Sequence, residues 1–463
     1  MAREREMSFE RHMSDNEALM WNLEKDPALS SWFASITILD TVPSIERLRS
    51  RLAVAVADIA RLRQRVVPSV GRLSPPMWAE DPEFDLDYHI RRMAVPSPGG
   101  PAELHEMAAN LLLDPFERTR PLWQFVVIEG LEGGKAALFQ KMHHTITDGE
   151  GGIRLAEKFT DFERDASHDD PVIEVGQRPV GEDFGESARE ALGHNVRRVG
   201  GVTQRVVKSV VLNPFGTAAG VGAVVGEVAK TLAPAGDPSE AVGSPLWKTR
   251  SLKRWYGTIQ IPFDDAKKAG KGLGGTINDF FVAGALAGSV AYHEARESAP
   301  HKLRVAMPVS TRKDGSAGGN QFSITTNELD APTGAAAAFE VVRDGLADAK
   351  AGTSVDILGS LSMVINLLPT SVLAKFAKDA ASSVDFTVSN VRGAPFEVYI
   401  AGAKVEALYP MGPIAATAFN LSMMSYAGML DMGLVVDAGA VDEPEELRDH
   451  IEAAYRELIE LGT

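Results

Sequence analysis

Two β-rich runs separated by a glycine-rich turn restrict the fold of this chain more than any other feature. The runs cover residues 123–129 and 135–144, and Gly-Leu-Glu-Gly-Gly at 130–134 lies between them. Apolar runs on both sides of a short glycine-containing turn are typical of a β-hairpin. Residues 153–163 then favour a helix, so the second strand leads through a short loop into a helix. This order predicts a sheet with helices packed against it.

Helix-like and strand-like patterns interleave along the rest of the chain. Apolar residues recur at helical spacing over residues 48–62 and alternate with polar residues, as in a half-buried strand, over 84–90. The later patterns predict strands at 256–261 and 303–308, strands between 385 and 436, and helices at 276–296, within 335–380 and at 444–461.

A length of 463 residues favours two or three domains. Because both halves mix strands and helices, we expect an α/β (α+β) fold with two sandwich-like domains, 1–181 and 246–463, joined by a helical linker at 182–245. Within the linker, valines and basic residues occupy different faces of a helix over 197–210. Two interpretations remain open for this basic amphipathic helix: packing across both domains, or contact with a membrane surface.

Charge and cysteine content exclude several classes of function. The net charge of −16 opposes general nucleic-acid binding. The chain has no cysteine, which excludes disulfides, thiolate metal sites and an acyl-cysteine intermediate. The charged first residues precede no apolar stretch, and the uncharged run at 213–226 is too short for a membrane span. We therefore expect a cytoplasmic protein.

Residues 143–149, His-His-Thr-Ile-Thr-Asp-Gly, end the second strand of the hairpin. Histidine suits a general base because its pKa lies near operating pH. Consecutive strand residues point to opposite faces, so only one histidine can serve one site, which also disfavours a metal site. The spacing to Asp148 favours His144 over His143 as the base. Asp148 could brace the site or pair with an arginine.

No serine lies in a Gly-x-Ser-x-Gly elbow, so with no cysteine either, direct transfer without a covalent intermediate is the simpler mechanism. The oxyanion that forms then needs fixed donors. Thr276 and Asp279 have the spacing of a helix capping box, which places Asn278 in the first turn. Asn278 is either an oxyanion donor or an ordinary first-turn polar residue.

Two further segments contain possible site residues. Pro121, Leu122 and Trp123 enter the first strand of the hairpin, and we expect Trp123 to be buried. Residues 389–393, Ser-Asn-Val-Arg-Gly, follow a strand-like run and predict a strand-end turn, for which structural use is favoured over catalytic use.

In this order, the motifs resemble the bacterial wax ester synthase/diacylglycerol acyltransferase family. The histidine motif alone is shared by a superfamily that includes chloramphenicol acetyltransferase and condensation domains. The ordered set is more specific. It comprises residues 14–24, 114–116, 121–123, 143–149, 276–279, 307–312, 319–321 and 389–393.

The resemblance implies two chloramphenicol-acetyltransferase-like domains with the active-site channel between them. Acyl-CoA would be a co-substrate, with no other cofactor and no metal, and a fatty alcohol or diacylglycerol would accept the acyl group. His144 would be the base, with Asn278 in the active site and Asp148 chiefly structural. Peripheral contact with the inner membrane face or lipid droplets fits such substrates. The remaining motif residues would line the channel or support the fold: Gly149, Pro121, Leu122, Trp123, Asp279, Ser389, Asn390 and Arg392.

Two alternatives stay open beside a lipid-forming O-acyltransferase. One is an acyltransferase of the same fold that acts on a specialised acceptor, such as a polyketide-type alcohol or an amine. The other is a non-catalytic lipid-surface protein that uses the basic segment around 197–208 to bind membranes.

Overall fold

The computed structural model describes residues 11–68, 75–147, 149–166, 242–310, 322–351 and 370–463. The predicted linker at 182–245 lies outside these residues except for 242–245, and so does Asp148. The elements of the first half are α1 (Asp15–Leu23), β1 (Trp32–Leu39), α2 (Ile45–Asp58), β2 (Gln64–Val67), β3 (Met77–Glu80), α3 (Leu86–His89), β4 (Ile90–Ala94), α4 (Pro101–Leu113), β5 (Trp123–Glu129), β6 (Ala136–His143), α5 (Gly149–Phe159) and β7 (Thr160–Asp161).

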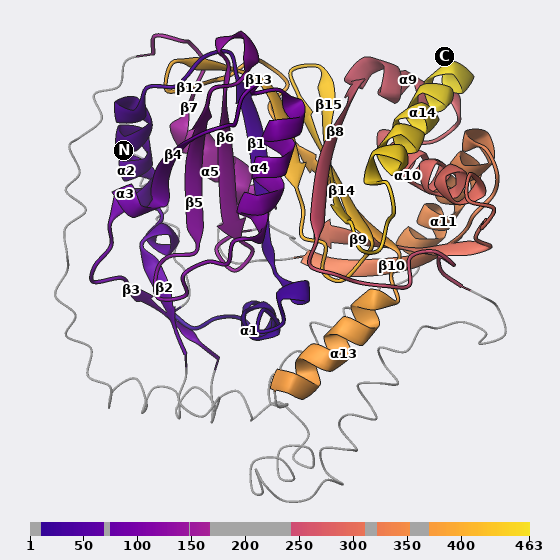
Figure 1. Ribbon diagram of the computed structural model, residues 1–463, viewed down its shortest axis with the longest axis horizontal. Helices are drawn as coiled ribbons and strands as arrows, with labels where there is room; N and C mark the ends of the chain where they lie inside the picture. Colours follow the sequence, from indigo (N-terminus) through magenta and orange to yellow (C-terminus); the bar gives the residue numbers. More distant parts are fainter. Residues whose placement is uncertain (1–10, 69–74, 148, 167–241, 311–321, 352–369) are drawn as a thin grey trace, which may run out of the picture.

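The second half supplies a longer set of strands and the helices that cover them (Figure 1). Its elements are β8 (Arg254–Pro262), α9 (Phe263–Gly272), α10 (Ile277–Glu294), β9 (Lys302–Ser310), β10 (Phe322–Asp330), α11 (Ala335–Ala351), α13 (Thr370–Ser382), β11 (Phe386–Arg392), β12 (Tyr399–Ile400), β13 (Ala403–Met411), β14 (Phe419–Tyr426), β15 (Met429–Asp437) and α14 (Pro444–Gly462).

Two mixed sheets lie side by side (Figure 1). A sheet of seven strands has the order β4-β5-β6-β1-β13-β12-β7, and a sheet of six has the order β10-β9-β11-β14-β15-β8. The seven-stranded sheet is thus built from both halves of the chain. In particular, β13 pairs antiparallel with β1, from Ala34 opposite Met411 to Leu39 opposite Val405. The predicted domain boundaries stay a prediction. The pairing of β13 with β1 shows that the second predicted domain supplies strands to the sheet of the first.

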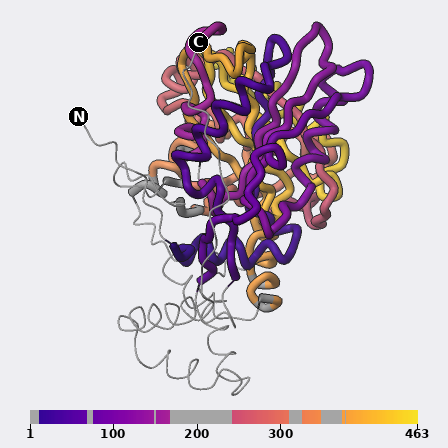
Figure 2. The backbone as a smooth tube through the Cα atoms, turned by 90° about the vertical axis from the view of Figure 1, so that its left-hand side faces the viewer, coloured from indigo at the N-terminus to yellow at the C-terminus, as the bar shows by residue number. Residues whose placement is uncertain are grey.

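The layers follow from which side chains are apolar on each face. On one face of the seven-stranded sheet, alternate residues of β5 and β6 share a hydrophobic core with α2 and α5, and α1 adds residues to the same core. On the other face, α4 and residues of β8 and β15 pack over the intervening ones. The six-stranded sheet is covered by α9, α10, α11 and α14 (Figure 1). Seen from the side of the first half, the second half lies largely behind the first (Figure 2). Among the described helices, none combines the length and the apolar character that crossing a membrane requires.

The predicted α/β character and the hairpin are confirmed. β5 pairs antiparallel with β6, from Trp123 opposite Met142 to Ile128 opposite Ala137. The helix at 276–296 and the helix at 444–461 are confirmed as α10 and α14.

Three predictions of local structure are wrong. Residues 86–89 form a helical turn rather than a strand, because the Asp85 side chain accepts a hydrogen bond from the N–H of Asp87, and the strand begins only at Ile90. The predicted helix at 48–62 ends at Asp58, and residues 60–62 form a separate short 3₁₀ turn. Residues 389–392 belong to a strand rather than a turn, because β11 pairs parallel with β14 as far as Arg392 opposite Ser425.

Candidate active site

The histidine pair lies where β6 ends, beside the first residues of β1. The N–H of His143 donates to the carbonyl of Leu122 at 3.0 Å, and the N–H of His144 donates to the carbonyl of Ser31 at 3.0 Å. The backbone of the pair is therefore held from both neighbouring segments. One of them is the predicted Pro121-Leu122-Trp123 motif, which the structure brings directly against the histidines.

His143 is fully buried, and both of its ring nitrogens make hydrogen bonds. Nδ1 accepts from the backbone N–H of Thr145 at 3.0 Å and lies 2.7 Å from the Thr145 hydroxyl. Because Nδ1 acts as an acceptor, the ring proton is on Nε2, which donates to Glu24 Oε1 at 2.5 Å. The ring of His143 is thus engaged in holding the turn that follows β6.

His144 points to the other face of the sheet. Its ring centroid lies 4.5 Å from that of Phe33, whereas His143 pairs in register with Trp32, the neighbour of Phe33 on β1. The predicted opposite orientation of the two rings is therefore present. His144 is only half-buried, so of the two rings it is the one with access to a ligand.

The start of α10 has the predicted capping box. The Thr276 hydroxyl accepts from the N–H of Asp279 at 3.2 Å, and the Asp279 carboxylate accepts from the N–H of Thr276 at 2.8 Å. Asp279 is 5% exposed and engaged in the cap. Asn278 in the first turn is half-buried and accepts a hydrogen bond at 3.5 Å from the side chain of Asn390. Two motifs far apart in sequence therefore meet here.

The other predicted motif residues lie in strands or at the start of a helix. Trp123 is 2% exposed, and its indole N–H donates to the carbonyl of Leu62 at 2.7 Å, which confirms the predicted burial. Gly149 is the first residue of α5. Ser389 lies within β11 opposite Ser422, and Arg392 is exposed at the end of that strand.

A cavity of about 300 Å³ lies where the two halves of the chain meet, on the His143 side of β6. Its wall is mainly apolar, with three charged side chains. It is lined by Glu24, Pro27, Ser30, Trp32, Leu112, Leu113, Pro115, Phe116, Arg118, Leu122, Leu252, Arg254, Pro413, Ile414 and Val435.

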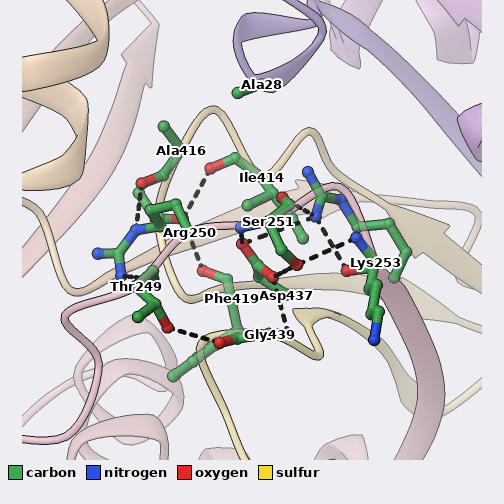
Figure 3. Close-up of polar contacts among 12 residues, drawn as sticks. Ala28, Thr249, Arg250, Ser251, Lys253, Ile414, Ala416, Phe419, Asp437 and Gly439 are labelled. Carbon is green, nitrogen blue, oxygen red and sulfur yellow. Dashed lines mark hydrogen bonds and ion pairs between the residues drawn. The ribbon is translucent and has the colours of Figure 1, made fainter.

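Hydrogen bonds fix the part of this wall that leads into β8 (Figure 3). The Asp437 carboxylate accepts from the N–H of Ser251 at 2.6 Å and from the N–H of Gly439 at 3.0 Å. Arg250 donates to the carbonyls of Ala416 and Trp247 at 2.5 and 2.6 Å. Asp437 thus ties the end of β15 to the segment that carries Leu252 into the cavity wall.

Two charged residues near the histidines were not predicted as site residues, although Glu24 ends the segment 14–24 that belongs to the resemblance. Glu24 contacts His143 from a position distant in sequence, so no local pattern indicates it. Lys141 lies two residues before His143 on the same face of β6 and is fully buried. Its amine donates to the carbonyls of Leu111 and Asp114, and burial lowers its pKa to about 7. A lysine within an apolar strand run was the available signal.

This two-sheet fold is that of solved acyltransferases and condensation domains. The structure of the wax ester synthase/diacylglycerol acyltransferase from Marinobacter aquaeolei VT8 matches with a TM-score of 0.66 and 19% identity, covering 98% of this chain and 100% of that chain. The first condensation domain of the CDA synthetase matches with a TM-score of 0.58 and 16% identity, covering 98% and 96%. These similarities define the class of fold.

Sequence similarity then defines the family. The model of the wax ester synthase/diacylglycerol acyltransferase catalytic domain matches residues 13–281, and that of the family's C-terminal domain matches 318–459. A Mycobacterium tuberculosis protein provisionally named a diacylglycerol O-acyltransferase is 32% identical over 457 residues, 96% of this chain and 91% of that protein. Another, named tgs1, is 29% identical over 430 residues, 91% and 89%. The chain belongs to this family and is an acyltransferase of lipid biosynthesis.

Proposed function

We propose that this protein transfers a long-chain acyl group from acyl-CoA to the hydroxyl of diacylglycerol or of a fatty alcohol. The names of its relatives, as diacylglycerol O-acyltransferases and a wax ester synthase, support these two acceptors. The predicted membrane or lipid-droplet contact depends on residues 197–208, which lie outside the described residues, and stays a prediction.

The proposed mechanism rests on the orientation of His144. It is half-buried at a strand end, while His143 is buried with both ring nitrogens engaged. His144 takes the proton of the acceptor hydroxyl as its oxygen attacks the thioester carbonyl. The tetrahedral intermediate then collapses with cleavage of the carbon–sulfur bond, and the imidazolium returns the proton to the departing CoA thiolate. The chain has no cysteine, which supports direct transfer in a ternary complex.

Asn278 is the proposed oxyanion donor. Its side-chain oxygen accepts from Asn390, which leaves the amide N–H groups of Asn278 to donate elsewhere. The first turn of α10 adds backbone N–H groups and the positive end of the helix dipole. Arg392 and Asp148 are proposed to support the fold around the site.

Replacing the base tests the proposal. We expect His144→Ala to lower turnover of a long-chain acyl-CoA with hexadecanol or diacylglycerol by about 10²–10⁴-fold, the usual loss for a positioned base. Asn278→Ala should lower it by about 10²-fold through loss of one oxyanion donor. CoA release gives the rate, and mass spectrometry identifies the ester.

The control is His301→Ala, which removes an exposed histidine before β9 and should leave turnover unchanged. Near-normal turnover by the His144 variant would refute the proposed mechanism. An ester formed only with a different class of acceptor would refute the proposed substrates and favour the specialised-acceptor alternative.

A further inference from the structure

One carboxylate oxygen joins the two chain segments that support His144. Glu24 Oε1 accepts from the N–H of Ser31 at 2.9 Å and from Nε2 of His143 at 2.5 Å. The side chain of Glu24 is only 6% exposed. Removing a buried acceptor of this kind leaves two buried donors unsatisfied, so the bonds are costly to lose.

Both partners of Glu24 act directly on the backbone around His144. The carbonyl of Ser31 accepts the N–H of His144 itself. The ring of His143 accepts the N–H of Thr145, the residue on the other side of His144. The chain before, at and after His144 is therefore held by two groups, and Glu24 binds both of them.

Glu24 is in turn held by α1, whose C-terminal cap it forms. A capping box between Ser14 and Glu17 fixes the start of this helix. Near its end, the guanidinium of Arg118 lies 3.4 Å from the centre of the Trp21 ring and donates to the Trp21 carbonyl at 2.7 Å. The backbone of Glu24 is therefore held in place, so its carboxylate can fix the positions of the start of β1 and the end of β6.

We propose that Glu24 is a positioning residue for His144: through Ser31 and His143 it fixes the backbone from which the base projects. The inference rests on the proposed function of His144. Misplacing a catalytic group by about 1 Å can cost roughly 10²-fold in rate, so a support that touches no substrate still controls turnover.

Three substitutions of Glu24 distinguish the effect of side-chain length from the effect of charge. Because both bonds end on Oε1, Glu24→Gln offers the same oxygen at the same reach without the charge. Glu24→Asp keeps the charge but is one methylene shorter, and Glu24→Leu lacks any acceptor. We expect the Gln variant to keep kcat within about threefold, and the Asp and Leu variants to lose about 10–10²-fold in kcat with KM for acyl-CoA changed less than about threefold.

Lys141→Met is the matched control for loss of stability. Lys141 is buried on the same face of β6, two residues before His143, but its bonds go to the end of α4. This variant should lower Tm and leave kcat unchanged.

Three results would overturn the inference: full kcat in the Asp and Leu variants, equal losses in the Gln and Leu variants, or a loss of kcat that follows Tm across all four proteins. His144→Ala, measured in parallel, separates the two proposals. If that variant is inactive while Glu24→Leu keeps full kcat, only the positioning role fails. If His144→Ala keeps its turnover, the base assignment itself fails.

Discussion

Asp431 of β15 is a buried carboxylate whose hydrogen bonds connect the two sheets. It is fully buried, accepts from the side-chain amide of Gln260 at 2.8 Å, and accepts from the N–H of Leu408 in β13 at 2.7 Å. Burial raises its pKa to about 6 from an ordinary value of 3.8. Between these pH values, the folded protein keeps a proton that the unfolded chain has released.

Because of Asp431, the free energy of unfolding should fall as pH rises from about 4 to 6. Above pH 6 this group should cause no further fall. Asp431→Asn cannot titrate, and its amide can satisfy both partners if the Gln260 amide turns over. We expect the Tm of the variant minus that of the wild type to increase from pH 4 to pH 6. Thermal unfolding at several pH values measures this difference, and a difference that is flat or decreasing would contradict the assignment.

Asp385→Asn provides the contrast. The two oxygens of Asp385 accept from the backbone N–H groups of Ser244 and Arg304, at 2.7 and 2.8 Å. An asparagine amide would place N–H against one of these donors, so this variant should lose about 1–3 kcal/mol at pH 7.

At the scale of elements, α10 and α14 pack so closely that only glycine fits at the contact. A Cβ on Gly288 of α10 would lie 2.4 Å from the Cα and 2.6 Å from the backbone nitrogen of Ile451 in α14. Because these are backbone atoms, a rotamer change cannot relieve the clash. We expect Gly288→Ala to destabilise the protein by about 1–3 kcal/mol in chemical denaturation.

Gly152→Ala is the helical control. A Cβ at Gly152 of α5 meets nothing within 4 Å, so this substitution should be neutral or stabilise by up to about 1 kcal/mol through helix propensity. Equal effects of the two substitutions would show that the α10–α14 contact yields easily.

Elements with strong local determinants could be predicted from the sequence, whereas those set by a partner could not. The capping box at Thr276 and the turn between β5 and β6 need only neighbouring residues, and both are confirmed. The alternation over 84–90 looked like a strand, but the cap at Asp85 favours a helical turn. β11 extends through Arg392 because β14 supplies its partners, which the local sequence does not show.

The same distinction applies to the candidate site. The opposite faces of His143 and His144 follow from their adjacency in a strand. The contact of Asn278 with Asn390, and that of His143 with Glu24, join residues more than a hundred positions apart. Such pairs depend on the tertiary fold, and a single sequence contains no periodic signal for them.

At the scale of the whole molecule, the seven-stranded sheet depends on β13, which follows the predicted linker. Without it, the edge of β1 from Ala34 to Leu39 would lack its hydrogen-bond partner. We expect a fragment of residues 1–245 to show no cooperative thermal transition and to be cleaved rapidly by protease. Adding the fragment 246–463 should restore protection. Cooperative unfolding of the first fragment alone would show that its sheet is complete without β13.

The place of β13 in the sheet also has a consequence for synthesis. Translation produces β1 among the first strands and β13 among the last, at about 5–20 residues per second. For roughly tens of seconds, the nascent chain holds β1 with β6 available on one side and nothing to pair on the other. An open strand edge of this kind readily pairs with a neighbouring chain, so we expect the yield of folded protein to depend on how well β1 is kept apart from other chains until β13 has been synthesised.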